Sequence, residues 1–125
     1  LLLLSGALLL LNLILLVPRR HQVPPAAGPG RLRVGLVFDV GGRGDKSFND
    51  AAYLGVSRAA RELGVYTEYV EPGEGSDRES GLRLLAARGF DLVIGVGFIF
   101  SDDLYAMAQE YPKIRFANSI LPRLW

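Results

Sequence analysis

The chain has 125 residues, a length that suits one α/β domain and is short for two. Its 14 basic and 13 acidic residues leave a formal net charge of +1, which gives no case for a nucleic-acid-binding face. The absence of cysteine excludes disulfides, thiolate nucleophiles and Cys-based metal sites, and a single histidine, His21, argues against a zinc site or a His-dependent triad. We therefore expect no metal and no other cofactor.

The first thirty residues differ in composition from the rest. Residues 1–17 are almost wholly apolar, and their length lies between a signal-peptide core and a minimal membrane span of about 17–25 residues. We predict a signal peptide or membrane anchor here, which places the protein at the extracytoplasmic face of the cell membrane. Residues 18–30 are rich in proline and glycine and predict a linker. The folded domain is expected over residues 31–125.

The first half of that domain alternates between strand and helix patterns. The apolar run Val34–Phe38 predicts a buried strand. Apolar positions at helical spacing predict a helix over Ala51–Leu63, ending at a glycine, with Ser47 or Asn49 as its N-cap. The stretch Val65–Val70 predicts a second strand, on which the two tyrosines are expected to pack.

The second half repeats the alternation. A capping box formed by Ser76 and Glu79 predicts a helix to about Arg88, with Leu82, Leu84 and Leu85 facing inward. The continuous apolar run Asp91–Val96 is typical of a buried parallel strand. A helix capped by Ser101 or Asp102 follows to about Glu110, and Ile114–Ala117 predicts a fourth strand. This order predicts an α/β fold: an open, mostly parallel sheet with flanking helices.

Candidate ligand-binding residues follow the first strand. In open α/β sheets, ligands bind beyond the carboxyl ends of the strands. The loop there offers backbone N–H groups, polar side chains and one aromatic ring, a set that suits a neutral, hydroxyl-rich ligand with a flat ring. The candidates are Asp39, Ser47, Phe48, Asn49 and Asp50. The tripeptide that spans residues 43–45, Arg-Gly-Asp, is interpreted as a chance match.

A second candidate wall follows the third strand. Phe98 comes directly after that strand, where it would either line the ligand site or join the core. The neighbouring Asp102 and Asp103 are explained by helix capping and by the helix dipole rather than by an acid pair or a metal site.

A phosphate-binding P-loop is an alternative interpretation of the first loop. The stretch from Gly41 to Ser47 almost meets the pattern G-x-x-x-x-G-K-[ST], but Asp45 stands where the glycine before Lys46 should be. A carboxylate there would face the phosphates, and its Cβ would lie where the backbone must approach them. The sequence therefore argues against a nucleotide-using enzyme of this type.

Three stretches carry a family resemblance. The sequences VGLVFDVGGRGDKSFNDAAYLG, DLVIGVGFIFSDDL and YPKIRFA, between about Arg33 and Ala117, resemble the basic membrane protein family of nucleoside-receptor lipoproteins. Its members are substrate-binding proteins of ABC transporters. The resemblance implies a periplasmic-binding-protein fold of two α/β lobes, with a purine nucleoside between them. It also implies that Phe48 stacks on the base and that Asp39 and Asn49 hydrogen-bond to base or ribose.

The chain also departs from the family pattern. Family members continue the last strand into an acidic residue, whereas Asn118 and Ser119 stand here, and the lipid-modified cysteine of the family is absent. The missing acidic residue predicts an incomplete first lobe, and the missing cysteine argues against a lipid anchor and leaves a cleaved signal peptide or an uncleaved anchor.

The sequence predicts a binding protein rather than an enzyme, since no nucleophile stands beside a base. We expect an extracytoplasmic substrate-binding protein, or a fragment of one, that captures a purine nucleoside-like solute for import. Its partners would be ABC permease subunits, and the membrane through the N-terminal segment. The alternatives are the ligand-binding domain of a cytoplasmic regulator of the same fold and, less favoured, a P-loop-like enzyme.

Overall fold

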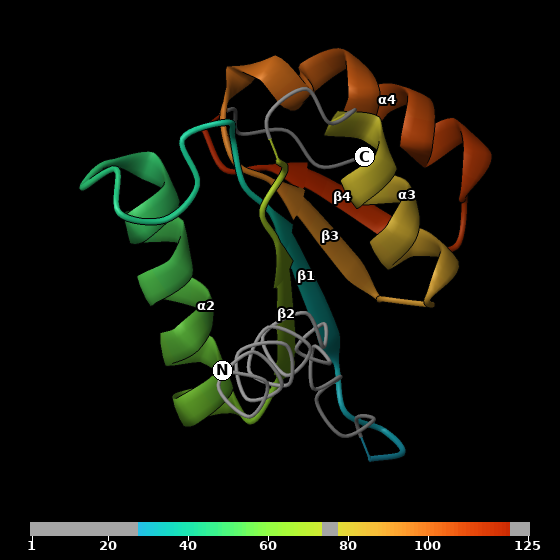
Figure 1. Ribbon diagram of the computed structural model, residues 1–125. Coiled ribbons are helices and arrows are strands. Elements are labelled where there is room, and N and C mark those ends of the chain that lie inside the picture. Colours follow the sequence, from blue (N-terminus) through green and yellow to red (C-terminus); the bar gives the residue numbers. More distant parts are fainter. Residues whose placement is uncertain (1–27, 74–77, 121–125) are drawn as a thin grey trace, which may run out of the picture.

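The structure, a computed structural model, describes residues 28–73 and 78–120. Four parallel strands form one sheet in the order β2-β1-β3-β4 (Figure 1). They are β1 (Arg33–Val37), β2 (Tyr66–Val70), β3 (Leu92–Gly95) and β4 (Arg115–Asn118). The predicted α/β class with a parallel sheet is therefore confirmed. The proposed signal or anchor segment lies outside the described residues.

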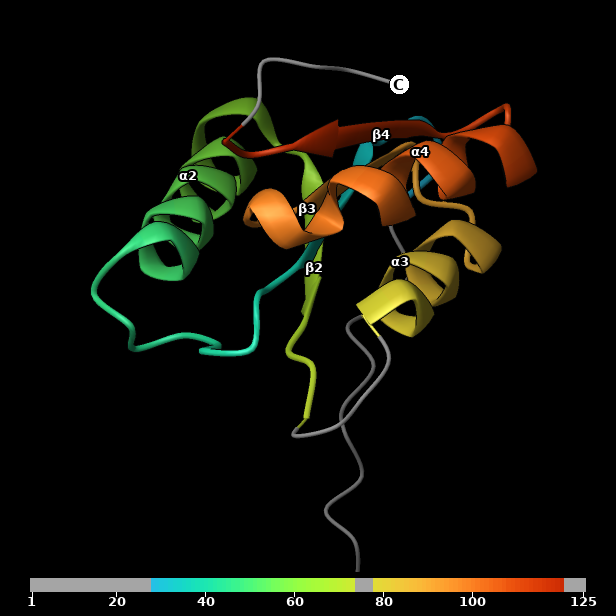
Figure 2. The same cartoon turned by 90° about the horizontal axis from the view of Figure 1, so that it is seen from above.

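The helices connect consecutive strands. They are α2 (Phe48–Leu63), α3 (Arg78–Ala87) and α4 (Ser101–Glu110), and a 3₁₀ turn, η1 (Phe98–Phe100), leads into α4. Parallel neighbours need such crossovers, which place helices on the faces of the sheet. Figure 2 shows α2 on one side of the sheet and α3 and α4 on the other. Within the described ranges, no helix has the length and apolarity that a membrane crossing requires.

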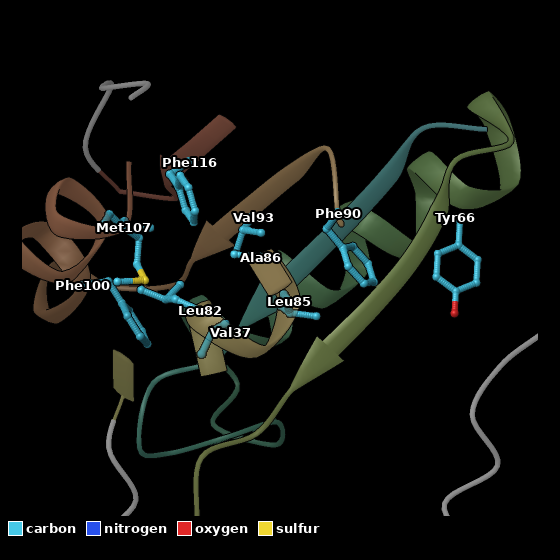
Figure 3. Close-up of a cluster of buried hydrophobic side chains, with 11 residues drawn as sticks. Val37, Tyr66, Leu82, Leu85, Ala86, Phe90, Val93, Phe100, Met107 and Phe116 are labelled. Atoms are coloured by element: carbon cyan, nitrogen blue, oxygen red, sulfur yellow. The ribbon is translucent and has the colours of Figure 1, made fainter. Parts of the chain in front are cut away.

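Buried side chains form a core on each face of the sheet. The face under α3 and α4 carries the larger cluster (Figure 3), whose members are Val37, Tyr66, Leu82, Leu85, Ala86, Phe90, Val93, Phe100, Leu104, Met107 and Phe116. The face under α2 carries a smaller cluster of Val34, Leu36, Phe38, Val65 and Val96. Successive residues of a strand point to opposite faces, so the continuous apolar runs of the sequence supply both cores.

One inward-facing residue of α3 was predicted wrongly. Leu82 and Leu85 are fully buried, but Leu84 is 49% exposed. Residues three apart share a helix face, whereas a residue two positions along points away from it. The helix ends at Ala87, followed by Gly89 with a left-handed φ of 71°. Gly64 ends α2 in the same way with a φ of 67°, as expected.

The predicted cap of α4 is also wrong. The N-cap position belongs to Phe100, and no side chain caps this helix. The Ser101 backbone N–H donates to the carbonyl of Phe98, and its hydroxyl donates to the same oxygen at 2.8 Å. The 3₁₀ turn thus satisfies groups that a side chain would otherwise cap. In the predicted capping box of α3, Ser76 lies outside the described residues.

Candidate functional site

Two connections meet beyond the carboxyl ends of the central strands. Because β1 and β3 are adjacent, the β1–α2 loop (residues 38–47) and the β3–α4 turn (residues 96–100) lie at the same edge of the sheet (Figure 1). A Cβ built on Gly97 would lie 3.3 Å from Asp39 Oδ2, so the two connections touch. Gly97 has a φ of 115°, a conformation that residues with side chains rarely adopt. This edge is where an open α/β sheet binds its ligand.

Asp39 lies at the contact between the loop and the turn. Its side chain is partly exposed, and Oδ1 accepts a hydrogen bond of 2.6 Å from the backbone N–H of Val40. Its own backbone N–H donates to Asn49 Oδ1 at 3.2 Å. Asp39 is therefore held by the loop and still presents carboxylate surface at the edge of the sheet.

Asn49, in the first turn of α2, is almost fully enclosed. It is only 2% exposed, and its hydrogen bond to Asp39 ties the start of the helix to the end of β1. A buried amide needs such partners, since its desolvation is costly otherwise. In this structure the side chain faces its own loop, so a bond to ligand stays a prediction for Asn49.

Two carboxylates shape the rest of the loop. Asp45 accepts hydrogen bonds from the backbone N–H groups of Ser47, Asn49 and Asp50 at 2.8, 3.2 and 3.3 Å. These bonds, the one from Ser47 first, lower the pKa of Asp45. Asp50 accepts from the N–H groups of Gly44 and Lys46 at 2.7 and 2.9 Å. Asp50 thus holds the loop.

The helix start differs from the prediction. α2 begins at Phe48, three residues earlier than expected, and Ser47 occupies the N-cap position without a side-chain capping bond. Asn49 lies within the helix rather than at its cap. Asp45 takes over the capping through an Asx turn, in which an Asp binds the N–H two residues on. The Asp-x-Ser spacing in the sequence was the signal that could have shown this.

The position of Asp45 bears on the phosphate alternative. A phosphate at a helix N-terminus is held by the free N–H groups of the first turn. Here the carboxylate of Asp45 already binds those of Asn49 and Asp50. A second anion would have to displace it against like-charge repulsion. The geometry therefore disfavours a P-loop and suits a neutral ligand.

Two exposed aromatic rings lie at this edge. Phe48 at the start of α2 and Phe98 at the start of η1 are each 60% exposed. The sequence left two roles open for Phe98, a core residue or a wall of the site. The exposure of its side chain excludes the core role. The remaining phenylalanines of the domain are nearly or fully buried: Phe38, Phe90, Phe100 and Phe116. Phe48 and Phe98 are thus available as stacking surfaces.

A third strand supports the β3–α4 turn. Asn118, at the end of β4, is 6% exposed. Its Nδ2 donates to the Gly97 carbonyl at 2.8 Å, and its Oδ1 accepts from the Ile120 N–H at 2.9 Å. The position where the resemblance implies an acidic side chain thus holds the backbone beneath Phe98. Sequence reasoning missed this role, because it depends on β3 and β4 being neighbours.

Arg43 is a further residue that sequence reasoning did not single out. Its Nε donates to Glu71 Oε1 at 2.7 Å, and this hydrogen bond raises the pKa of Arg43. The guanidinium also lies over the rings of Tyr53 and Tyr69.

The two tyrosines of β2 pack against other side chains, as predicted. Tyr69 contacts the Arg43 guanidinium. The buried Tyr66 packs against Phe90, with ring centres 6.1 Å apart.

Comparison with known proteins places this architecture in a family. The model of the Bmp family, described as PnrA-like ABC transporter substrate-binding proteins, matches residues 32–119. The chain belongs to the Bmp family. The match agrees closely with the span of the resemblance in the sequence, and it covers the sheet, its helices and the candidate site.

Individual Bmp relatives agree with this placement. An uncharacterized lipoprotein of Pyrococcus abyssi is 47% identical over 88 residues, which are 70% of this chain and 22% of the relative. The ABC transporter nucleoside-binding protein BmpA of Lactococcus lactis is 28% identical over 104 residues, 78% of this chain and 30% of BmpA. A solute-binding protein of an ABC transporter system from Aeropyrum pernix superposes with a TM-score of 0.62 at 43% identity. That match covers 70% of this chain and 24% of that structure.

The chain thus spans between about a fifth and a third of the length of these relatives. Among the residues that the structure describes, no three His, Cys, Asp or Glu side chains gather in a way that could hold a metal ion. The Lactococcus relative is named as a nucleoside-binding protein, and the Aeropyrum structure as a solute-binding protein.

Proposed function

We propose that this chain is one lobe, the first, of an extracytoplasmic receptor that captures a purine nucleoside-like solute for an ABC transporter. Membership of the Bmp family supports the transporter part of the proposal. The name of the Lactococcus relative, a nucleoside-binding protein, supports the class of solute. The permease subunits of the transporter would be its protein partners.

One observation carries the ligand assignment: Phe48, 60% exposed, and the partly exposed Asp39 lie at the same carboxyl edge of the sheet, where Asn49, the residue after Phe48, accepts a hydrogen bond from the Asp39 N–H. An exposed ring offers a stacking face for a purine, and a carboxylate accepts hydrogen bonds from ribose hydroxyls or from N–H groups of a base. Phe98 would form a second aromatic wall. Asp45 fills the anion site at the start of α2, which favours a nucleoside over a nucleotide.

The cellular location is part of the same proposal. Relatives from Pyrococcus abyssi and Pyrococcus furiosus are named as lipoproteins. We propose that the receptor works at the outer face of the cell membrane, reached through the apolar segment of residues 1–17. Fusion of residues 1–30 to a topology reporter tests this; an extracytoplasmic signal is expected, and a cytoplasmic one would favour a regulator.

Calorimetric titration tests the ligand assignment. A complete receptor that carries this lobe is titrated with guanosine, adenosine, inosine and uridine. We expect purine nucleosides to bind, and the Phe48→Ala variant to lose about 1–3 kcal/mol of binding free energy, the usual cost of removing a base-stacking ring. Asp39→Ala should also weaken binding, because ligand groups lose their acceptor.

A matched control lies at the far end of the same helix. Leu63, the last residue of α2, is 76% exposed, so Leu63→Ala should leave the affinity unchanged. Unchanged affinity in both Phe48→Ala and Asp39→Ala would remove these residues from the site. Failure of every nucleoside to bind would remove the solute assignment and leave the family membership intact.

A further inference from the structure

Arg43 connects the β1–α2 loop to parts of the fold outside it. Its Nε donates to Glu71 Oε1 at 2.7 Å, and its backbone N–H lies 3.4 Å from the same oxygen. The guanidinium carbon lies 5.0 Å from the ring centre of Tyr53 on α2 and 4.6 Å from that of Tyr69 on β2. The two rings meet edge to face at 5.6 Å. We call Arg43, Tyr53, Tyr69 and Glu71 the arginine clamp.

The carboxylate contacts described above act within the loop and the first turn of α2. Asp45 and Asp50 bind backbone N–H groups no more than six residues away. They set the local shape of the loop. The clamp instead joins residue 43 to β2 and to the segment after it, which lie 26 and 28 residues further along the chain. It thus fixes where the loop lies relative to the sheet.

Arginine suits this task chemically. Its planar guanidinium can stack on aromatic rings and at the same time donate to a carboxylate. The loop around it contains three glycines, Gly41, Gly42 and Gly44, two of them at positive φ. Glycine-rich backbone loses much conformational entropy when it is ordered, so a loop of this composition needs contacts that hold it.

We propose that Arg43 is a positioning residue for ligand binding, which holds the β1–α2 loop in the conformation that presents Phe48 and Asp39. Its hydrogen bond and its stacking contacts are made within the protein, so it acts without touching the solute. This inference rests on the proposed function for its ligand-binding consequence, but not for the conformational one.

The positioning role predicts a particular kinetic signature. If the clamp is lost, the loop occupies its binding-competent conformation for only a fraction of the time, and the apparent affinity falls by that fraction. The association rate then falls, whereas the dissociation rate of the bound solute stays nearly constant. Loss of a direct contact to ligand would instead speed dissociation.

Hydrogen exchange of the full chain tests the conformational claim without any ligand. In Arg43→Ala, we expect backbone amides of residues 40–47 to exchange about five to ten times faster, in keeping with an exposed ion pair and cation–π contacts. In Arg43→Lys, which keeps the charge but loses the planar guanidinium, exchange should be intermediate between Arg43→Ala and the unsubstituted chain. Arg58→Ala removes an exposed arginine paired with Glu62 on α2 and should leave the loop unchanged. Unaltered exchange in Arg43→Ala would overturn the proposal.

Rapid-mixing kinetics on a complete receptor tests the functional claim. We expect Arg43→Ala to slow nucleoside association about five- to tenfold with little change in dissociation, and Arg43→Lys to recover part of the rate. Glu71→Gln should act through the same clamp, so the double variant should be no worse than Arg43→Ala alone. Additive effects, or an unchanged association rate in Arg43→Ala, would overturn the positioning role. If no nucleoside binds, the proposed function fails, and the exchange experiment still decides whether the clamp exists.

Discussion

The two connections at the candidate site are built in opposite ways. The β1–α2 loop is long and glycine-rich, and it is held by hydrogen bonds from its backbone N–H groups to carboxylates and an amide oxygen, and by the arginine clamp. The β3–α4 turn is short and is held mainly by the packing of its last residue, the fully buried Phe100, together with one buried hydrogen bond from Asn118 to the Gly97 carbonyl. A Cβ on Gly95 would lie 2.7 Å from Phe100, so the absence of a side chain there lets the ring pack against the strand.

One edge of the sheet thus combines a loop held by polar contacts with a turn held mainly by apolar packing. The charged contacts of the loop are exposed and are weakened by salt or acid, whereas an apolar contact beneath the turn is insensitive to both. We expect the turn to be the rigid wall of the site and the loop to be the adjustable one. Substitutions in the turn and in the loop test this difference.

The largest effect is expected beneath the turn. Phe100→Ala should lower the free energy of unfolding by about 3–5 kcal/mol, because it removes a fully buried ring from the core. Phe98→Ala, two residues away and 60% exposed, should change it by less than about 0.5 kcal/mol. Urea denaturation measures both. Similar costs at the two positions would show that the turn is not held by packing.

A smaller effect is expected at the contact between turn and loop. Gly97→Ala should cost about 1–3 kcal/mol, since its φ of 115° is strained for a side chain and the new Cβ would approach Asp39. Gly41→Ala in the loop is the matched control, because its Cβ would meet only ordinary contacts, the nearest at 3.7 Å. Equal stability of the two variants in urea denaturation would contradict a tight junction at Gly97.

The smallest effect is expected in the loop, and it should depend on pH. The pKa of Asp45 is lowered from its ordinary value of 3.8, chiefly by the hydrogen bond from Ser47, so its ionised form stabilises the fold. That contribution is complete above the unfolded pKa and is lost as the pH falls through the lower, folded pKa. Asp45→Asn should therefore reduce Tm by a few degrees at pH 7, and the difference from the unsubstituted chain should shrink as the pH falls below 3.8.

Ser47→Ala provides the control for Asp45→Asn, because the hydroxyl makes no capping bond. Thermal denaturation of both variants at several pH values shows which of the two residues caps α2. A larger loss of Tm in Ser47→Ala than in Asp45→Asn at neutral pH would show that Ser47, rather than Asp45, caps α2.

The strands were predictable because their apolar runs are local and continuous. The run around Leu36 and the one around Val93 each identify a buried strand without knowledge of the fold. The helices followed from spacing, with Leu84 as the exception. The position of the candidate site followed from the rule that ligands bind beyond the carboxyl ends of such strands.

The contacts within the site were less accessible to sequence reasoning. Asp45, rather than Ser47 or Asn49, caps α2, because several polar residues compete for the same N–H groups and geometry decides among them. Arg43 and Asn118 have partners that lie far away in the sequence, such as Tyr69 on β2 and Gly97 after β3, and these contacts cannot be inferred from spacing along the chain. Sequence thus locates the loop, and tertiary contacts determine its shape.

The sheet order also sets the order in which the fold can assemble. The central strand β1 comes first in the chain, but Val34 pairs with Thr67 on one side and with Leu92 on the other. Neither pairing is local, and contacts so distant in sequence slow the folding of a domain. During synthesis β1 can therefore pair first with β2 on one side, and its other edge stays unpaired until β3 has been made.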